Sequence, residues 1–127
     1  MKRFFALFLT MFAFVACTQN AIAQEKFDAA LFEAQLSAGK SILVVAHAPW
    51  CSTCRAQESA LKSIYANDTY KNITYFVVDF DSQKEVLKKF GIQRQSTLIV
   101  FKDGKEVGRN IGATSTSTIE SLLKQAL

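Results

Sequence analysis

Apolar residues form three short runs in this chain, and each run has the length of a buried β-strand. The runs cover residues 41–47, 73–78 and 97–101. They are rich in β-branched and aromatic side chains, which favour strands, and polar residues follow each of them closely. Asp103-Gly104 comes after the third run and is a hairpin signal, so we predict a fourth strand over residues 106–111.

Segments with helical spacing of apolar residues alternate with these strands. Residues 27–36 carry apolar side chains three and four positions apart, with Asp28 as a candidate N-cap and Gly39 as a stop. Further helices are predicted over residues 51–67, 82–90 and 117–126. The inner face of the helix at 51–67 is expected to carry Ala56, Ala60, Leu61 and Ile64. This alternation predicts an α/β sandwich with helices on both faces of a central sheet.

The first 23 residues differ from the rest of the chain and are interpreted as a secretory signal peptide. Lys2-Arg3 precedes an apolar stretch over residues 4–16, and Ala21-Ile22-Ala23 has the pattern of a cleavage site. The stretch is too short for a membrane span, which takes about 20 apolar residues. We expect cleavage at this pattern and a single domain over residues 24–127, beginning at Gln24. The alternative is a retained membrane anchor.

A second processing route would involve Cys17. Phe14-Val15-Ala16-Cys17 is similar to a bacterial lipobox, in which Cys17 is lipidated and becomes the first mature residue. A phenylalanine at the outermost position is unusual there, and the downstream alanine pattern is a competing site. Both routes take the domain out of the cytoplasm. We therefore expect a periplasmic or secreted protein, associated with a membrane only if Cys17 is lipidated.

Length and charge exclude several classes of function. The chain has 127 residues, enough for one domain, and contains no internal repeat or low-complexity tract. Its formal net charge is +4, and the loss of Lys2 and Arg3 with the leader leaves +2. The remaining charges alternate in sign along the chain and form no basic stripe. A nucleic-acid partner is therefore not expected.

The candidate chemistry lies in Trp50-Cys51-Ser52-Thr53-Cys54, directly after the first predicted strand. With a leader removed at Ala23, Cys51 and Cys54 are the only thiols left. A disulfide between cysteines so close in sequence closes a tiny loop and restricts the unfolded chain little. We therefore interpret the pair as a reactive dithiol rather than a structural staple.

The order of the two cysteines assigns them different roles. Cys51 is predicted to stand at the start of a helix, where unpaired N–H groups and the helix dipole favour a thiolate. It is the candidate attacking thiol, expected to be exposed and flanked by Trp50. Cys54 lies one turn inside the helix and is the candidate resolving thiol, which attacks Cys51 in a mixed disulfide.

With these motifs in this order, the chain resembles the thioredoxin family across its whole mature length. The matching segments are Trp50-Cys51-Ser52-Thr53-Cys54, Val78-Asp79-Phe80-Asp81, Phe90-Gly91-Ile92, residues 97–104 and residues 107–113. The resemblance implies a three-layer sandwich with a mixed central sheet and a protein-disulfide reductase or isomerase activity. It implies protein thiols or disulfides as substrates, together with a redox partner. We expect a monomer without a small cofactor.

The chain departs from the family pattern at three positions. Thioredoxins carry a buried acid where this chain has Val45 and a lysine where it has Val77, so their proton relay is absent. Ser96, next to Thr97, takes the place of a cis-proline that faces the dithiol. A cis bond before a non-proline residue costs about 2.5–4 kcal/mol, so the Gln95–Ser96 bond is expected to be trans. The loop that faces Cys51 should then differ from that of the family.

The candidate supporting residues around the cysteines are Trp50, His47, Arg55, Ser96 and Thr97. Ser52-Thr53 replaces the Gly-Pro of reducing thioredoxins and helps to set the reduction potential. Arg55 either tunes the thiolate with its positive charge or is a solvated helix residue. His47, the only histidine, is either a base that replaces part of the relay or a strand residue with one hydrogen bond.

Two other functions fit the same cysteines. The first is a metal or iron–sulfur module that uses Cys51, Cys54 and His47. These residues supply three ligands, and a closed zinc site takes four, so a dimer or an outside ligand would be needed. The second is a binding or chaperone-like domain whose dithiol rests as a disulfide.

Overall fold

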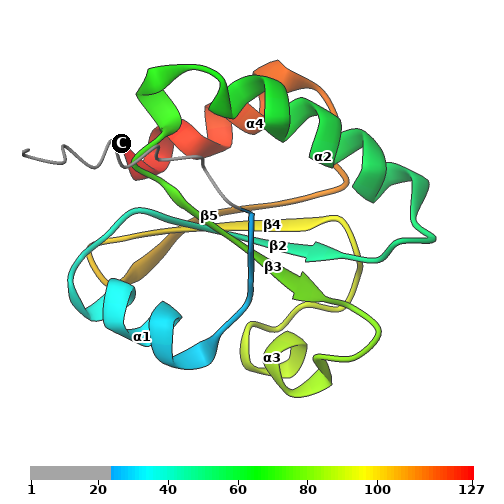
Figure 1. Cartoon of the computed structure of the whole chain (residues 1–127), viewed down its shortest axis with the longest axis horizontal. Coiled ribbons are helices and arrows are strands. Elements are labelled where there is room, and N and C mark those ends of the chain that lie inside the picture. Colours follow the sequence, from blue (N-terminus) through cyan, green and yellow to red (C-terminus); the bar gives the residue numbers. More distant parts are fainter. Residues whose placement is uncertain (1–23) are drawn as a thin grey trace, which may run out of the picture.

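The computed structural model describes residues 24–127, and in it a central sheet is covered by helices on both faces (Figure 1). One face carries α2 (Ser52–Tyr65) and α4 (Thr116–Leu123), and the other carries α1 (Ala29–Ser37) and α3 (Lys84–Lys89). Two short 3-10 turns, η1 (Asp68–Tyr70) and η2 (Lys124–Ala126), follow α2 and α4. This arrangement confirms the predicted three-layer α/β sandwich.

The sheet has five strands in the order β1-β3-β2-β4-β5. Their bounds are β1 Glu25–Lys26, β2 Ile42–His47, β3 Thr74–Asp79, β4 Thr97–Lys102 and β5 Lys105–Ile111. The pairs β1–β3 and β3–β2 are parallel, whereas β2–β4 and β4–β5 are antiparallel, so the sheet is mixed as expected. The central strand β2 ends at His47, and the chain reaches the cysteines directly from that end.

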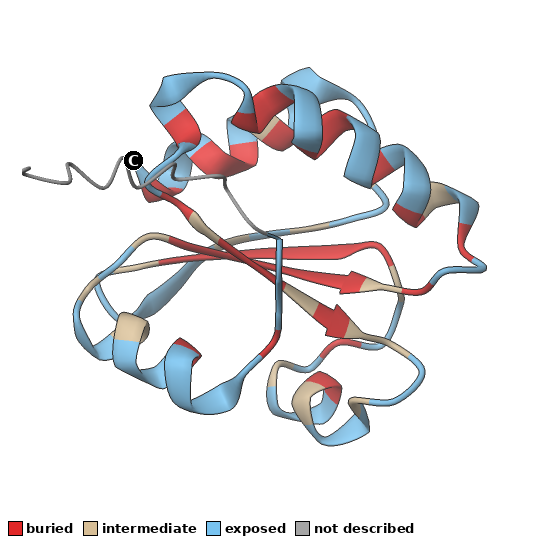
Figure 2. Cartoon of the chain, in the orientation of Figure 1, coloured by how far each residue is buried: buried red, intermediate tan, exposed pale blue. Residues whose placement is uncertain are grey.

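Two hydrophobic cores lie on opposite faces of the sheet, and β2 contributes to both (Figure 2). Leu43 and Val45 pack in the core under α2 and α4, while Ile42, Val44 and Ala46 pack in the core over α1 and α3. Because successive side chains of a strand point to opposite faces, a strand covered on both sides is apolar at every position. This explains why the run 42–46 shows no alternation of apolar and polar residues.

Phenylalanines dominate the core on the α1 and α3 face. Phe32 lies at the centre of this cluster and is 1% exposed. The ring centroids of the other four members lie 5.1–6.1 Å from that of Phe32, mostly in edge-to-face contact. These members are Phe27, Phe76, Phe90 and Phe101. The cluster anchors α1 to the sheet face opposite α2.

The ends of α1 follow the sequence prediction. Asp28 is the N-cap, and its Oδ1 accepts a hydrogen bond of 2.8 Å from the backbone N–H of Leu31. The helix ends at Ser37, with Ala38 as its C-cap, and Gly39 follows with φ +70°, a left-handed conformation that glycine adopts without steric cost.

Other boundaries differ from the prediction. The third helix begins at Lys84 rather than Ser82, because Asp79 Oδ1 accepts hydrogen bonds from the N–H groups of Asp81 and Ser82 and holds them in a turn. In α2, Ala56 is exposed and Gln57 is buried, so our assignment of Ala56 to the inner face was wrong. The last helix is capped by Ser115 and ends in the 3-10 turn η2.

Two short elements, β1 and η1, had no counterpart in the prediction. With two residues, β1 is too short to show a period in the sequence. No helix within residues 24–127 has the length and apolar content needed to cross a membrane. The expected signal peptide and Cys17 lie outside the described residues.

Candidate active site

The first turn of α2 holds the two cysteines. Cys51 is the N-cap of the helix, with extended backbone angles of φ −87° and ψ 112°. Its Sγ accepts a hydrogen bond of 3.1 Å from the backbone N–H of Cys54, which otherwise has no partner within the helix. The loop is closed by the N–H of Cys51, which donates to the carbonyl of Ala48 at 3.1 Å. The sulfur of Cys51 therefore occupies the electropositive end of α2.

The two cysteines form a disulfide, with their Cα atoms 5.2 Å apart. Cys54 has no exposed surface, and Cys51 is 6% exposed, so Cys51 is the more accessible sulfur. The sequence led us to expect an exposed Cys51, and the structure buries it further than that. The cause is a small apolar cluster in which Ala48 and Phe80 pack around the disulfide.

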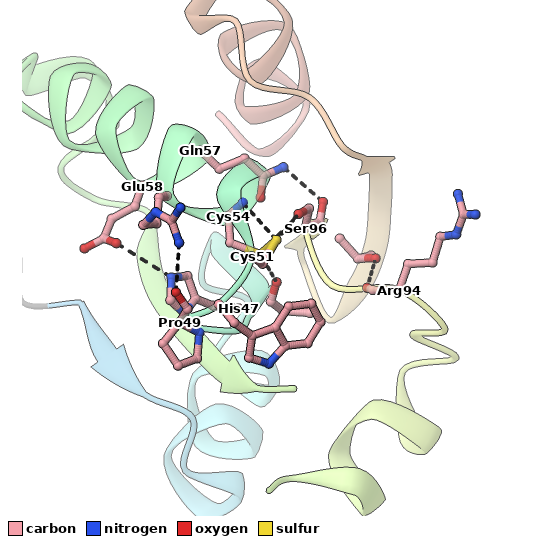
Figure 3. The surroundings of a disulfide bond; sticks show 12 residues. His47, Pro49, Cys51, Cys54, Gln57, Glu58, Arg94 and Ser96 are labelled. Atoms are coloured by element: carbon pink, nitrogen blue, oxygen red, sulfur yellow. Dashed lines mark hydrogen bonds and ion pairs between the residues drawn. A yellow bond between two sulfur atoms is a disulfide. The ribbon is translucent and has the colours of Figure 1, made fainter. Parts of the chain in front are cut away.

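Ser96 lies against both sulfurs (Figure 3). Its Oγ is 3.2 Å from Cys51 Sγ and 3.1 Å from Cys54 Sγ, and the residue is 3% exposed. Since disulfide sulfurs carry no proton, the Ser96 hydroxyl is the donor in this oxidised state. No cis peptide bond occurs within residues 24–127, so Gln95–Ser96 is trans as predicted.

The backbone of Ser96 is held at three points. Its N–H donates to the carbonyl of Ala46 at 2.8 Å, and its carbonyl accepts from the N–H of Gly112 at 2.9 Å. The same carbonyl accepts a hydrogen bond of 3.0 Å from Gln57 Nε2. Ser96 has φ +63°, a left-handed conformation that the sequence did not indicate for a serine. The loop therefore presents a side-chain hydroxyl to the dithiol.

Gln57 is a member of the site that the sequence analysis missed. It lies three residues after Cys54, on the same face of α2, and is fully buried. Within residues 24–127 its Oε1 has no hydrogen-bond partner. A glutamine one helical turn after the second cysteine was a signal for this role, because a polar residue on an inner helix face needs a partner.

The positions of the missing relay lie side by side in the sheet. Val45 of β2 and Val77 of β3 are cross-strand partners, and Val45 is 2% exposed. Both side chains contact the core under α2 and α4. The face of the sheet beneath Cys54 is therefore apolar at the two places where the family carries an acid and a lysine.

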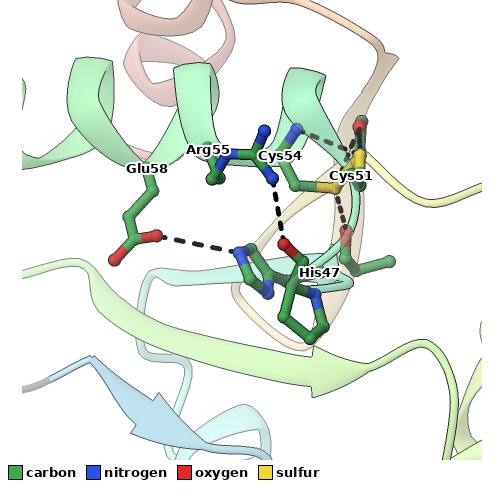
Figure 4. A network of polar contacts seen from close by, with 8 residues as sticks. His47, Cys51, Cys54, Arg55 and Glu58 are labelled. Carbon is green, nitrogen blue, oxygen red and sulfur yellow. Dashed lines mark hydrogen bonds and ion pairs between the residues drawn. A yellow bond between two sulfur atoms is a disulfide. The ribbon is translucent and has the colours of Figure 1, made fainter.

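His47 points toward Glu58 rather than toward the sulfurs (Figure 4). Its Nε2 lies 3.7 Å from Glu58 Oε2, which is too long for a hydrogen bond. Within residues 24–127 no hydrogen bond joins His47 to either cysteine.

The imidazole of His47 borders a pocket of about 350 Å³ that is also lined by Lys26 and Asp79. The backbone N–H groups of Asp81 and Ser82 hold the pKa of Asp79 below its usual range.

The remaining candidates support the loops around the disulfide. Trp50 is 59% exposed, and its Nε1 donates to Asp81 Oδ2 at 2.9 Å. Arg55 donates from a guanidinium nitrogen to the carbonyl of Pro49 at 3.0 Å, which ties the first turn of α2 to the loop before it. Thr97 Oγ1 donates to the carbonyl of Arg94 at 2.7 Å and closes the turn before β4.

Metal-binding groups do not assemble within the described part of the chain. Between residues 24 and 127 no three His, Cys, Asp or Glu side chains are grouped to hold an ion.

A second pocket, of about 410 Å³, lies beside α2 and is lined in part by Leu61, Tyr65 and Tyr75. Burial raises the pKa of both tyrosines, so they stay neutral hydroxyls.

Comparison with known proteins places this site in a family. The sequence matches the family model described as Thioredoxin over residues 20–125. Thioredoxin from Porphyra purpurea is 31% identical over 98 residues, which cover 77% of this chain and 91% of that protein. Thioredoxin from Mycobacterium bovis is 33% identical over 92 residues, with coverage of 72% and 78%.

A solved structure agrees with the sequence relatives. Trxlp from Edwardsiella tarda EIB202 superposes with a TM-score of 0.76 at 37% identity, and the match covers 80% of this chain and 98% of that one. The family model spans most of the sequence and includes Cys51, Cys54 and Ser96. The chain therefore belongs to the thioredoxin family, and its Cys51–Cys54 pair is that of a dithiol–disulfide oxidoreductase.

Proposed function

We propose that this protein acts outside the cytoplasm on protein disulfides, with Cys51 as the attacking thiol and Cys54 as the resolving thiol. The observation that carries the assignment of roles is the position of Cys51 Sγ at the N-cap of α2, 3.1 Å from the N–H of Cys54. Backbone N–H groups at a helix N-terminus stabilise negative charge, which favours the thiolate on Cys51. Full burial of Cys54 supports the order, because a substrate meets the 6% exposed Cys51 first.

The exchange proceeds in two displacement steps. In the reducing direction, the Cys51 thiolate attacks one sulfur of a substrate disulfide, and the other substrate sulfur leaves as a thiolate. Cys54 then loses its proton and attacks Cys51 Sγ, which closes the internal disulfide and releases the second substrate sulfur. Two electrons pass from the dithiol to the substrate, and a separate redox partner restores the dithiol. The same steps in reverse oxidise a substrate.

The surface around the dithiol supports a protein as the substrate. Trp50 is 59% exposed beside the nearly buried Cys51, and its indole is oriented by the hydrogen bond to Asp81. An exposed aromatic ring next to a reactive sulfur offers contact area for the chain that carries the target disulfide.

Trapping of the mixed disulfide tests the roles of the two cysteines. With insulin as the substrate, Cys54→Ser is expected to stall as a covalent adduct that is visible by mass spectrometry and lost on treatment with dithiothreitol. Cys51→Ser is the matched control and is expected to form no adduct. An adduct on Cys51→Ser and none on Cys54→Ser would reverse the assignment.

Export rests on the sequence pattern before residue 24 and is tested by the mass of the protein from its native source. The expected N-terminus is Gln24, in a fraction outside the cytoplasm. A chain that begins at a lipid-modified Cys17 would contradict the proposed cleavage after Ala23 but would still place the protein outside the cytoplasm. A native protein that still begins at Met1 and stays in the cytoplasm would contradict export.

A further inference from the structure

We propose that the Ser96 hydroxyl carries the proton that Cys54 must lose when it attacks Cys51, in place of the carboxylate that the family uses. This inference rests on the proposed roles of the two cysteines. Within residues 24–127, Ser96 is the one residue whose side chain forms hydrogen bonds with the cysteine sulfurs, at 3.1 and 3.2 Å. A hydroxyl accepts and donates at the same time, so it can take up one proton as it gives up another.

In the described structure, the groups around Cys54 other than Ser96 offer no route for its proton. Cys54 has no exposed surface, so water does not reach it directly. The sheet beneath it presents Val45 and Val77, which carry no ionisable group. His47 is turned toward Glu58, with Nε2 3.7 Å from the carboxylate. The carbonyl of Ala46, 3.9 Å from Cys54 Sγ, would accept a hydrogen bond from the reduced thiol but cannot pass a proton onward.

The placement of Ser96 is maintained against a conformational cost. A left-handed backbone at a non-glycine residue brings Cβ close to the following carbonyl oxygen and is unfavourable. Three hydrogen bonds hold the residue in that conformation. The N–H of Ser96 donates to the carbonyl of Ala46, and the carbonyl of Ser96 accepts from Gly112 N–H and Gln57 Nε2. Gln57 is thus a positioning residue, since its amide fixes the loop that aims the hydroxyl. In this conformation, with φ +63°, Oγ lies within 3.2 Å of both sulfurs.

The proton moves during resolution of the mixed disulfide. As Cys54 Sγ attacks Cys51 Sγ, its proton passes to Ser96 Oγ, and the hydroxyl proton of Ser96 passes to the departing substrate sulfur. The bond between Cys51 and the substrate breaks, and the bond between Cys51 and Cys54 forms. Cys54 supplies the electron pair of the new bond, and the substrate sulfur takes the pair of the broken bond and leaves as a thiol. Over the attack and the resolution together, the cysteine pair gives two electrons to the substrate disulfide, and Ser96 ends as a neutral hydroxyl.

Stopped-flow kinetics separate this step from the attack by Cys51. Reduced protein is mixed with a peptide that contains one disulfide, and Trp50 fluorescence is followed. The first phase depends on the peptide concentration and reports the attack, whereas the second does not and reports resolution. Ser96→Ala is expected to slow the second phase about a hundredfold at pH 7, the lower end of the contribution of a positioned acid–base group. The deficit should close at alkaline pH, where Cys54 ionises without help.

Ser96→Gly is the matched variant, because it removes the same hydroxyl but relieves the left-handed backbone. Equal slowing in Ser96→Ala and Ser96→Gly, with a smaller effect of D₂O than in the natural protein, would support the relay. Natural rates in Ser96→Gly would show that the backbone, not the hydroxyl, matters, and would overturn it. Absence of the first phase in the natural protein would instead contradict the proposed function, since the proposed proton transfer takes place only in the second phase.

Discussion

Substitution of Val45 by aspartate tests how far this dithiol is limited by the absence of a buried acid. Val45 faces the core under α2, the helix that carries Cys54, and the next residue, Ala46, has its carbonyl 3.9 Å from Cys54 Sγ. An introduced carboxylate on that face would accept the proton of Cys54 directly. We therefore expect Val45→Asp to speed resolution of the mixed disulfide at neutral pH.

The cost of this substitution follows from burial. Val45 is 2% exposed, so loss of its side chain removes about 1.5–3 kcal/mol of hydrophobic stabilisation. Burial disfavours the charged carboxylate, and a carboxyl pKa raised by about three units lowers the free energy of unfolding by a further ~4 kcal/mol. Together the two losses exceed the lower end of the roughly 5–15 kcal/mol that a domain of this size has, so we expect the variant to be marginally stable at neutral pH.

The pH dependence of this cost has a defined sign. The introduced carboxyl has a higher pKa in the folded than in the unfolded chain, so the folded state binds more protons between the two values. The free energy of unfolding is then highest below the unfolded pKa of about 3.9 and falls as the pH rises toward the folded value. Urea unfolding of Val45→Asp from pH 4 to pH 7 measures this decline.

Val45→Asn is the control, because it has nearly the same size and polarity but no acid. Both variants should lose stability at pH 4, and only Val45→Asp should resolve mixed disulfides faster than the natural protein at pH 7. In a Ser96→Ala background, Val45→Asp is expected to restore much of the lost rate. If Val45→Asp and Val45→Asn resolve at the same rate from pH 6 to pH 8, the idea that a missing acid limits turnover is wrong.

Three further predictions test other parts of the molecule. Iodoacetamide at mildly acidic pH is expected to modify Cys51 of the reduced protein before Cys54, as judged by peptide mapping, and earlier labelling of Cys54 would contradict the N-cap argument. Phe32→Ala should lower the free energy of unfolding by about 3–5 kcal/mol, whereas Leu31→Ala, at a 40% exposed neighbour, should change it by less than ~0.5 kcal/mol. The lowered pKa of Asp79 means that its carboxylate stabilises the fold above the unfolded pKa of about 3.9, and this contribution is lost as the pH falls through the folded pKa. In urea unfolding, Asp79→Asn should therefore be less stable than the natural protein at pH 7, and the difference should close near pH 2.

The elements with a clear pattern of apolar residues or with local capping signals were predictable from the sequence. The central strands are apolar at nearly every position because both faces of the sheet are covered, and the Asp28 cap and Gly39 stop mark α1 by local chemistry alone. Boundaries set by tertiary contacts were not predictable. The start of α3 depends on the Asp79 carboxylate holding a turn, and β1 exists only because two residues pair with β3.

The site was predictable where chemistry is local and unpredictable where it depends on distant parts of the chain. The spacing of Cys51 and Cys54 on one helical turn was sufficient to predict their disulfide. The family resemblance predicted Ser96 in the loop that faces the dithiol. It did not predict the contact of the Ser96 hydroxyl with both sulfurs, 42 and 45 positions away in the chain, or the positive φ, which serine rarely adopts. Gln57 carried a local signal, a polar residue on the inner face of α2, but its partner, the Ser96 carbonyl, lies 39 positions further along the chain.

The use of a reactive sulfur as the N-cap of α2 couples the redox equilibrium to the start of that helix. A thiolate accepts the Cys54 N–H as a charge-assisted hydrogen bond, which is stronger than the bond that a disulfide sulfur accepts. If this hydrogen bond is stronger in the reduced than in the oxidised protein, the difference in free energy raises the reduction potential by about 30 mV for each 1.4 kcal/mol. Substitutions in the first turn of α2 that reinforce the cap of the reduced form will therefore make the protein a stronger oxidant, even where they touch neither sulfur.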